Sequence, residues 1–205
     1  MEKKLTIVFV ALIGLALIAC LWAYLQPAKA QETGEPGLTV VAAPEQTKAQ
    51  RPPCFPDPEA NYIPMPEGEN LALGKSVVSG VHNDVYVIEN VNDGKTDTYW
   101  ESKGFPAEVT VDLGESRRLT AVAVRLNPSA IWEPRTQEIA VALSADGTSY
   151  SEVSAAVKYD FDPATGNRIR IDFPAAEGRF VKLTFTLNTS SRTGGAQAAE
   201  IEIYE

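Results

Sequence analysis

The sequence predicts an all-β domain, a sandwich or a barrel, over residues 70–205. Short segments rich in valine, isoleucine and phenylalanine recur there, and glycine, proline, asparagine or aspartate separates them. Short strands joined by such turn residues are typical of both architectures. No longer stretch shows the periodicity of an amphipathic helix. The clearest candidate strands are residues 108–113, 119–126, 138–143, 168–173, 180–187 and 199–204.

Alternation within these segments predicts which side chains form the core, because successive residues of a strand point to opposite faces. Turn residues between the segments predict where the chain reverses, among them Gly114, Asp146–Gly147, Gly166–Asn167, Gly178 and Gly194–Gly195. The predicted core residues are Val111, Val122, Val124, Ile139, Val141, Ile169, Ile171, Val181, Leu183, Phe185, Ile201 and Ile203.

The first thirty residues have the pattern of an export segment. Lys3 and Lys4 precede an apolar run over 5–25, and Ala28–Lys29–Ala30 fits a small-x-small cleavage site. The run is also long enough to span a bilayer, and 17–20 loosely resembles a lipoprotein box ending at Cys20. A cleaved signal, a retained anchor and a lipoprotein therefore remain open. Each of them places residues 31–205 outside the cytoplasm, with membrane contact only through the N-terminal segment.

Residues 31–69 contain 8 of the 14 prolines of the chain and show no strand or helix periodicity. Proline fixes φ and removes a backbone donor, so this composition predicts an extended, solvated linker. It could serve as a spacer or as a tail without a spacer function, and the part near Tyr62–Ile63 could pack on the domain edge. The predicted organisation is thus an export segment (1–30), a linker (31–69) and one β domain (70–205), which we expect to be monomeric.

Charge and composition exclude several functions. The formal net charge is −9 over 205 residues, and without residues 1–30 it is −11, from 15 basic and 26 acidic groups. Such a surface repels nucleic acid and anionic membranes. Two cysteines, one of them in the apolar run, predict no disulfide framework, and Cys54 is a free thiol or an intermolecular link. With a single histidine, His82, and no phosphate-binding loop or nucleophile motif, the sequence predicts no enzyme.

An oxygen-rich turn at residues 90–98 has two interpretations. Asp93–Gly94 is a strong hairpin dipeptide, which favours an ordinary turn. However, a carboxylate and a hydroxyl lie close together here, and the acidic Glu200 stands among the apolar residues of the last strand. Ca²⁺ takes six to eight oxygen ligands, and it would compensate a buried carboxylate. The turn therefore also fits a structural cation site.

Several motifs in the same order resemble the discoidin superfamily, which includes the C-type domains of coagulation factors and carbohydrate-binding module family 32. The motifs are NLALGK (70–75), NDGKTDTYWES (92–102), VDLG (111–114), SADG (144–147), RFVKL (179–183) and AEI (199–201). Residues 127–137 resemble modules appended to bacterial glycoside hydrolases. The resemblance implies an eight-stranded jelly-roll β-sandwich of the galactose-binding-domain-like type, with Trp100 in its core.

The resemblance also implies a structural Ca²⁺. Its ligands would be the carbonyls of Asn90, Lys95 and Ala199, the Asp93 and Glu200 carboxylates, and Thr98 through its carbonyl and hydroxyl. Lys95 stands where many relatives carry Asp or Asn, so it can contribute only its backbone oxygen. Asp97 is expected to cap the turn or to lie on the surface.

Candidate ligand-binding residues lie in three loops. An exposed Trp132 could stack on a pyranose while the Arg135 guanidinium donates to sugar hydroxyls, or Trp132 could cap the sandwich while Arg135 pairs with Glu133 or Glu138. The resemblance places His82, Asn83 and Tyr86 at the ligand rim. The last loop brings Arg192 but lacks the aromatic residue expected in the hydrolase-associated modules.

These residues predict a non-catalytic module outside the cytoplasm that binds poly- or oligosaccharides at or near the cell surface. Two alternatives remain, a protein- or surface-adhesion module and a structural spacer without sugar binding.

Overall fold

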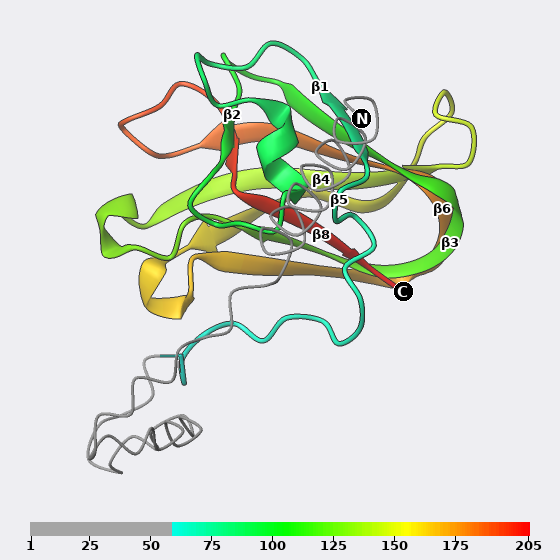
Figure 1. The fold of residues 1–205 in the computed structure, drawn as a ribbon, viewed down its shortest axis with the longest axis horizontal. Coiled ribbons are helices and arrows are strands. Elements are labelled where there is room, and N and C mark those ends of the chain that lie inside the picture. The colour runs from blue at the N-terminus through cyan, green and yellow to red at the C-terminus, as the bar shows by residue number, and fades with distance from the viewer. Residues whose placement is uncertain (1–58) are drawn as a thin grey trace, which may run out of the picture. The chain divides into compact units, whose positions relative to one another are not determined.

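The structure is a computed structural model that describes residues 59–205, and the domain is all-β (Figure 1). The predicted export segment, Cys20, Cys54 and the linker up to residue 58 lie outside the described residues. Within residues 59–205, no helix is long and apolar enough to cross a membrane.

The strands are β1 (Ser76–Ser79), β2 (Trp100–Glu101), β3 (Ala107–Arg125), β4 (Arg135–Ser144), β5 (Ser151–Phe161), β6 (Arg168–Asn188), β7 (Gln197–Ala198) and β8 (Glu200–Tyr204). Three 3₁₀ helices connect them, η1 (Ile88–Asn92), η2 (Ala130–Trp132) and η3 (Pro163–Thr165).

Two long strands build both layers of the sandwich. Strands β3 and β6 run antiparallel side by side and bend together at the right of Figure 1. On one side of the bend they lie in a sheet with β1, β4 and β5, in the order β1-β3-β6-β4-β5. Beyond the bend the second half of β3 pairs with β8. The eight strands thus form a β-sandwich, as predicted.

The bend corrects the predicted strand boundaries. Residues 108–113 and 119–126 were expected to be separate strands, but they belong to β3, and 168–173 and 180–187 likewise belong to β6. Gly114 and Gly178 were therefore wrongly predicted to be chain reversals. Gly114 (φ +85°) lies at a register shift between Asp112 and Arg117, so it bends the strand locally without ending it.

The core confirms the predicted inward faces. All twelve predicted core residues are buried, and Trp100 is buried among them, 1% exposed, with its ring centroid 5.8 Å from that of Phe185. The predicted turns at Asp146–Gly147 and Gly166–Asn167 are also present, the second with both residues at positive φ. The alternation of apolar residues was therefore a sufficient signal for the core.

The chain segment ahead of β1 packs on the sandwich. The Ile63 amide donates to the Thr165 carbonyl (3.1 Å), and the Tyr62 ring lies between Gly166 and the Arg168 guanidinium, whose Cζ is 5.0 Å from the ring centroid. Met65 packs on Ala121, Ala123 and Tyr204, on the outer face of β3 and β8. These contacts lie in the part of the predicted linker that the structure describes.

Candidate functional site

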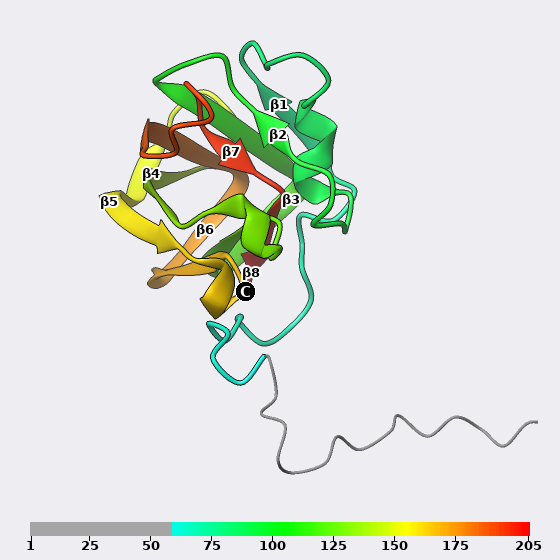
Figure 2. The ribbon, with the colours of Figure 1, turned by 90° about the vertical axis from the view of Figure 1, so that its left-hand side faces the viewer.

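Three loops meet at one end of the sandwich, on the side that faces the viewer in Figure 2, where β2 and β7 lie side by side. The loop after β1 is held against β2 by two backbone hydrogen bonds, from Asn83 N to the Glu101 carbonyl (2.7 Å) and from Glu101 N to the Tyr86 carbonyl (3.2 Å). The loop after β6 is held by the Ala196 amide, which donates to Ser102 Oγ (2.8 Å). The loop that contains η2 completes the end.

These loops enclose an open pocket of about 410 Å³, which we name the Trp132 pocket. Its lining residues come from four segments of the sequence. They are Asn83, Tyr86, Tyr99, Glu101, Ile131, Trp132, Arg135, Arg192 and Gln197.

Three aromatic rings form one wall of the Trp132 pocket. Tyr86 and Tyr99 are stacked, with ring centroids 4.3 Å apart and an interplanar angle of 23°. The Trp132 ring meets Tyr99 edge to face, at 4.7 Å and 87°. Such pairs stabilise each other beyond the area that they bury, so the two tyrosines hold the half-buried Trp132 indole in a fixed orientation. Burial and the interaction with Tyr86 raise the pKa of Tyr99, so its phenol stays neutral and can donate a hydrogen bond.

Arg135 forms the floor of the same pocket, and it is buried. Its Cζ lies 5.0 Å from the Trp132 ring centroid. Its guanidinium donates to the Trp132 and Glu133 carbonyls and to Gln197 Oε1 (2.5 Å). Burial lowers the pKa of Arg135, although the group remains a cation because its ordinary value is so high. The alternative ion pairs of Arg135 with Glu133 or Glu138 do not form. Arg135 donates to the backbone carbonyl of Glu133 and not to its carboxylate.

A buried carboxylate completes the polar side of the pocket. Glu101, 6% exposed, accepts from the Asn83 side-chain amide (2.7 Å) and from Gln197 Nε2 (2.8 Å). Gln197 thus bridges the anionic Glu101 and the cationic Arg135. Each Glu101 oxygen accepts only one of these hydrogen bonds, so the carboxyl group can accept further from the hydroxyls of a ligand.

Five of the six predicted ligand residues line this pocket, and one does not. Asn83, Tyr86, Trp132, Arg135 and Arg192 are brought together. His82 is outside the lining; its backbone forms an isolated bridge to Ser102, and its Nδ1 is buried without a hydrogen-bond partner among the described residues. Arg192 is exposed and pairs with Glu133 at 2.7 Å, so it lies on the rim.

Four lining residues were missed, Tyr99, Glu101, Ile131 and Gln197. The first two carried a usable signal. Once Trp100 is assigned to the core, the alternation of a strand turns Tyr99 and Glu101 to the opposite face. Gln197 had no such signal, because its place beside Glu101 depends on the β2–β7 register.

The predicted cation ligands also come together, 106 residues apart in the sequence. Glu200 Oε1 accepts from the amides of Gly94 (2.8 Å) and Lys95 (2.9 Å). Asp93 accepts from the Lys95 amide (2.9 Å) and from the Thr98 hydroxyl (2.8 Å). Asn90 lies in η1, and its side-chain nitrogen donates to the Tyr99 carbonyl (2.8 Å). The amide of Ala199, the residue before Glu200, donates a hydrogen bond to the Arg125 carbonyl (2.8 Å).

Glu200 has no cationic partner that the structure shows, although it is only 3% exposed. Burial, followed by the contact with the Asp93 carboxyl group, raises its pKa to about 7. A buried carboxylate beside a second carboxyl group fits a divalent cation, which would compensate the charge of Glu200. Among residues 59–205, no three or more His, Cys, Asp or Glu side chains are grouped so as to hold a metal ion, so a cation here would depend on two carboxylates together with hydroxyl and carbonyl oxygens.

Gly195 is required where the last loop meets β2. A Cβ atom at this position would lie 1.9 Å from the Ser102 carbonyl oxygen, a backbone atom that cannot rotate away. We expect Gly195→Ala to destabilise the domain by about 3 kcal/mol or more, because the new methyl group would force the last loop away from β2. Urea unfolding measures this change. Gly194→Ala is the matched control, because nothing lies within 4 Å of its Cβ position, and an equal loss in both variants would contradict the account.

The fold and the pocket define the class of this protein, a β-sandwich module with a pocket formed by loops at one end. The chain belongs to the F5/8 type C domain family, whose model matches residues 75–201. A comparison with curated proteins finds no match.

Solved structures with this fold include carbohydrate-binding modules. The chain is 25% identical to the CBM32 of AlyQ in complex with 4,5-unsaturated mannuronic acid (TM-score 0.53), over 63% of this chain and 94% of that chain. It is 18% identical to a CBM32 from Clostridium perfringens in complex with GalNAc-β-1,3-galactose (TM-score 0.56), over 67% and 100% of the two chains. Truncated AlyQ with CBM32 and alginate lyase domains is 24% identical (TM-score 0.53), and the match covers 63% of this chain but only 31% of that longer one.

Proposed function

We propose that this protein is a non-catalytic carbohydrate-binding module that holds glycans outside the cytoplasm, at or near the cell surface. The observation that carries the proposal is the Trp132 pocket, where an oriented indole, two tyrosines and a polar network meet in one cavity of about 410 Å³. An apolar ring face beside paired donors and acceptors is the chemistry that a pyranose presents, with its C–H face and its hydroxyls.

The polar network supports a neutral or weakly anionic sugar. Tyr99 offers a neutral phenol as a donor, and Glu101 accepts hydrogen bonds. The side-chain amides of Asn83 and Gln197 contain both donors and an acceptor. Arg135 contributes mainly by orienting Trp132 and Gln197, because its guanidinium is already occupied by protein acceptors. The relatives agree with this chemistry, since two of them were solved with a mannuronic acid derivative and with GalNAc-β-1,3-galactose.

The location rests on the sequence of the first thirty residues. Lysines ahead of a long apolar run favour export or anchoring, and the linker would then separate the module from the membrane. Residues 31–205 carry 15 basic and 26 acidic groups, a net charge that does not favour anionic lipid, so the membrane contact is assigned to the N-terminal segment alone.

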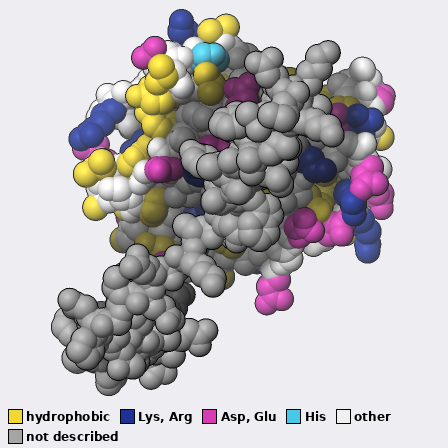
Figure 3. Space-filling model, viewed as in Figure 1, with side chains coloured by type: hydrophobic (Ala, Val, Ile, Leu, Met, Phe, Trp, Pro, Cys, Tyr) yellow, Lys and Arg dark blue, Asp and Glu magenta, His cyan; other side chains and the backbone are white. Residues whose placement is uncertain are grey.

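An adhesion module is the second candidate, and one observation favours it. Val81, Val85 and Ile131 are 70%, 69% and 73% exposed on the same end of the sandwich. Figure 3 shows hydrophobic side chains gathered on the left of the drawn face, near His82 in cyan. Exposed apolar groups beside a pocket are typical of a protein-binding surface.

We further propose a structural Ca²⁺ in the loop 90–98. The Asp93 and Glu200 carboxylates, Thr98, and the backbone carbonyls of Asn90, Lys95 and Ala199 would hold it. A cation there neutralises the two acids and fastens the loop to the start of β8. It would act on the fold and not on the sugar directly.

A glycan array with the full chain tests the proposed function. We expect binding to at least one glycan, and we expect Trp132→Ala to lower it tenfold or more, because the ring supplies the stacking face. The control is Val157→Ala, which removes a 48% exposed apolar side chain on β5, outside the Trp132 pocket. Silence of the wild type across neutral, amino and uronate glycans would move the assignment to the adhesion module.

A further inference from the structure

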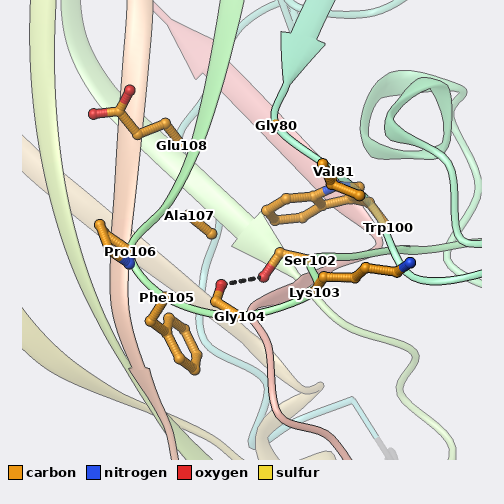
Figure 4. A pocket seen from close by; sticks show the side chains of 10 residues that line it. All are labelled: Gly80, Val81, Trp100, Ser102, Lys103, Gly104, Phe105, Pro106, Ala107 and Glu108. Carbon is orange, nitrogen blue, oxygen red and sulfur yellow. Dashed lines mark hydrogen bonds between the residues drawn. The ribbon is translucent and has the colours of Figure 1, made fainter.

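A second cavity, of about 450 Å³, lies beside the Trp132 pocket, and none of the predicted ligand residues lines it. We name it the Phe105 pocket. Figure 4 shows Trp100 on one side, Phe105 and Pro106 on another, and Val81 above the indole. Lys103 and Glu108 supply its charged groups.

The two pockets share one wall. Trp100 and Glu101 are the two residues of β2, and the first lines the Phe105 pocket while the second lines the Trp132 pocket. The loop after β1 borders both, since Val81 lines one and Asn83 the other, and the Lys103 amide donates to the Val81 carbonyl (3.1 Å). The two pockets therefore lie on either side of the loop after β1 and of β2.

The lining of the Phe105 pocket combines apolar faces with an available cation. The Phe105 side chain is 38% exposed and Val81 is 70% exposed, so two large apolar groups of the lining remain open to solvent. Glu108 pairs with Lys182 at 3.2 Å, but no ion pair involves Lys103 within residues 59–205. An exposed ring and an unpaired ammonium group suit a pyranose whose C–H face covers the ring while an oxygen, best a carboxylate, contacts Lys103.

An unused donor lies at the same place. Trp100 Nε1 is buried and has no acceptor in the described part of the chain. Figure 4 shows this nitrogen on the side of the indole nearest Val81. Buried donors normally have partners, and a rotation of the exposed Val81 side chain would open this one to a ligand oxygen.

We propose that the Phe105 pocket is a second sugar subsite, so that the protein binds a linear oligosaccharide across both pockets and not a single terminal sugar. This inference rests on the proposed function. Because of Lys103, an oligosaccharide of uronate residues is favoured over a neutral one.

The test compares short and long ligands by calorimetry with the full chain. The probes are mannuronate and galactose, each as the monomer and as the linear tetramer. We expect the mannuronate tetramer to bind at least tenfold more tightly than its monomer. Phe105→Ala and Val81→Ser should each lower tetramer affinity roughly threefold to tenfold and leave monomer affinity unchanged.

Val157→Ser is the control for Val81→Ser, since it alters a 48% exposed valine that lines neither pocket. In the same titrations the indole N–H signal of Trp100 in the NMR spectrum should shift with the tetramer and stay fixed with the monomer. Equal monomer and tetramer affinities, with no effect of either variant, would overturn the second subsite and leave the proposed function standing. No binding of any probe would overturn both.

Discussion

Without divalent cations, the protein is expected to lose stability as the pH rises from about 4.5 to about 7. The cause is Glu200, whose pKa is raised from 4.5 to about 7 in the folded protein. Between these values the folded state keeps the proton that the unfolded state releases, so a rising pH favours unfolding. The stabilisation is complete below about pH 4.5 and is lost above about pH 7, and it amounts to on the order of 3 kcal/mol.

Urea unfolding in a chelator, at several pH values, measures this loss. The control is Glu200→Gln, a neutral side chain that can still accept from the Gly94 and Lys95 amides. Subtracting its profile removes the contribution of other groups, such as Asp112, whose pKa is lowered by Arg179. If the unfolding free energies of wild type and variant change with pH in the same way from pH 4.5 to 7, the assignment to Glu200 is wrong.

Calcium should reverse the loss above pH 7, where the carboxylates are ionised. A ligand at one hundred times its dissociation constant stabilises the folded state by about 2.7 kcal/mol if it does not bind the unfolded chain. Asp93→Asn should abolish most of this gain. A wild type that calcium leaves unchanged would contradict the cation proposal but would leave the sugar pocket untouched.

The second large effect is expected for Arg135→Ala, at about 2–4 kcal/mol of unfolding free energy. The substitution removes a buried guanidinium and leaves Gln197 Oε1 and the Trp132 carbonyl without their donor. It also removes the cation that packs on the Trp132 ring. Glycan binding should therefore be lost together with stability.

The matched control for this substitution is Arg192→Ala. Arg192 lines the same pocket, but its side chain is 64% exposed and its pair with Glu133 is a surface pair, worth less than about 1 kcal/mol. Urea unfolding and near-ultraviolet circular dichroism of the tryptophan bands measure both variants. Equal stability losses would show that Arg135 does not organise the pocket.

The alternation of buried and less buried residues in β3, β4 and β6 was sufficient to predict a sandwich or a barrel, and the resemblance to the discoidin superfamily favoured the sandwich. The sequence was insufficient for the long strands, because Gly114 resembles a chain reversal and the bend of β3 depends on its pairing with β6. A residue with positive φ can either turn a chain or bulge a strand, and only the partner strand decides between them.

The site was predictable to the extent that its residues carry a local signal. Trp132 stood out as an aromatic residue in a loop, and Asp93 with Glu200 stood out as acids beside a turn and an apolar strand. Burial of Arg135 was not predictable, because its acceptor Gln197 is brought from 62 residues away by the packing of the last loop on β2. The exclusion of His82 from the pocket is likewise a result of backbone pairing with Ser102.

The most direct test of the central claim is the NMR signal of the Trp132 indole N–H during titration with the best glycan from the array. The signal can be assigned by Trp132→Phe, since the chain has three tryptophans. We predict that it shifts in proportion to saturation, together with the signals of the Asn83 and Gln197 side-chain amides. A glycan that binds while these three signals stay in place would show that the Trp132 pocket is not the sugar site.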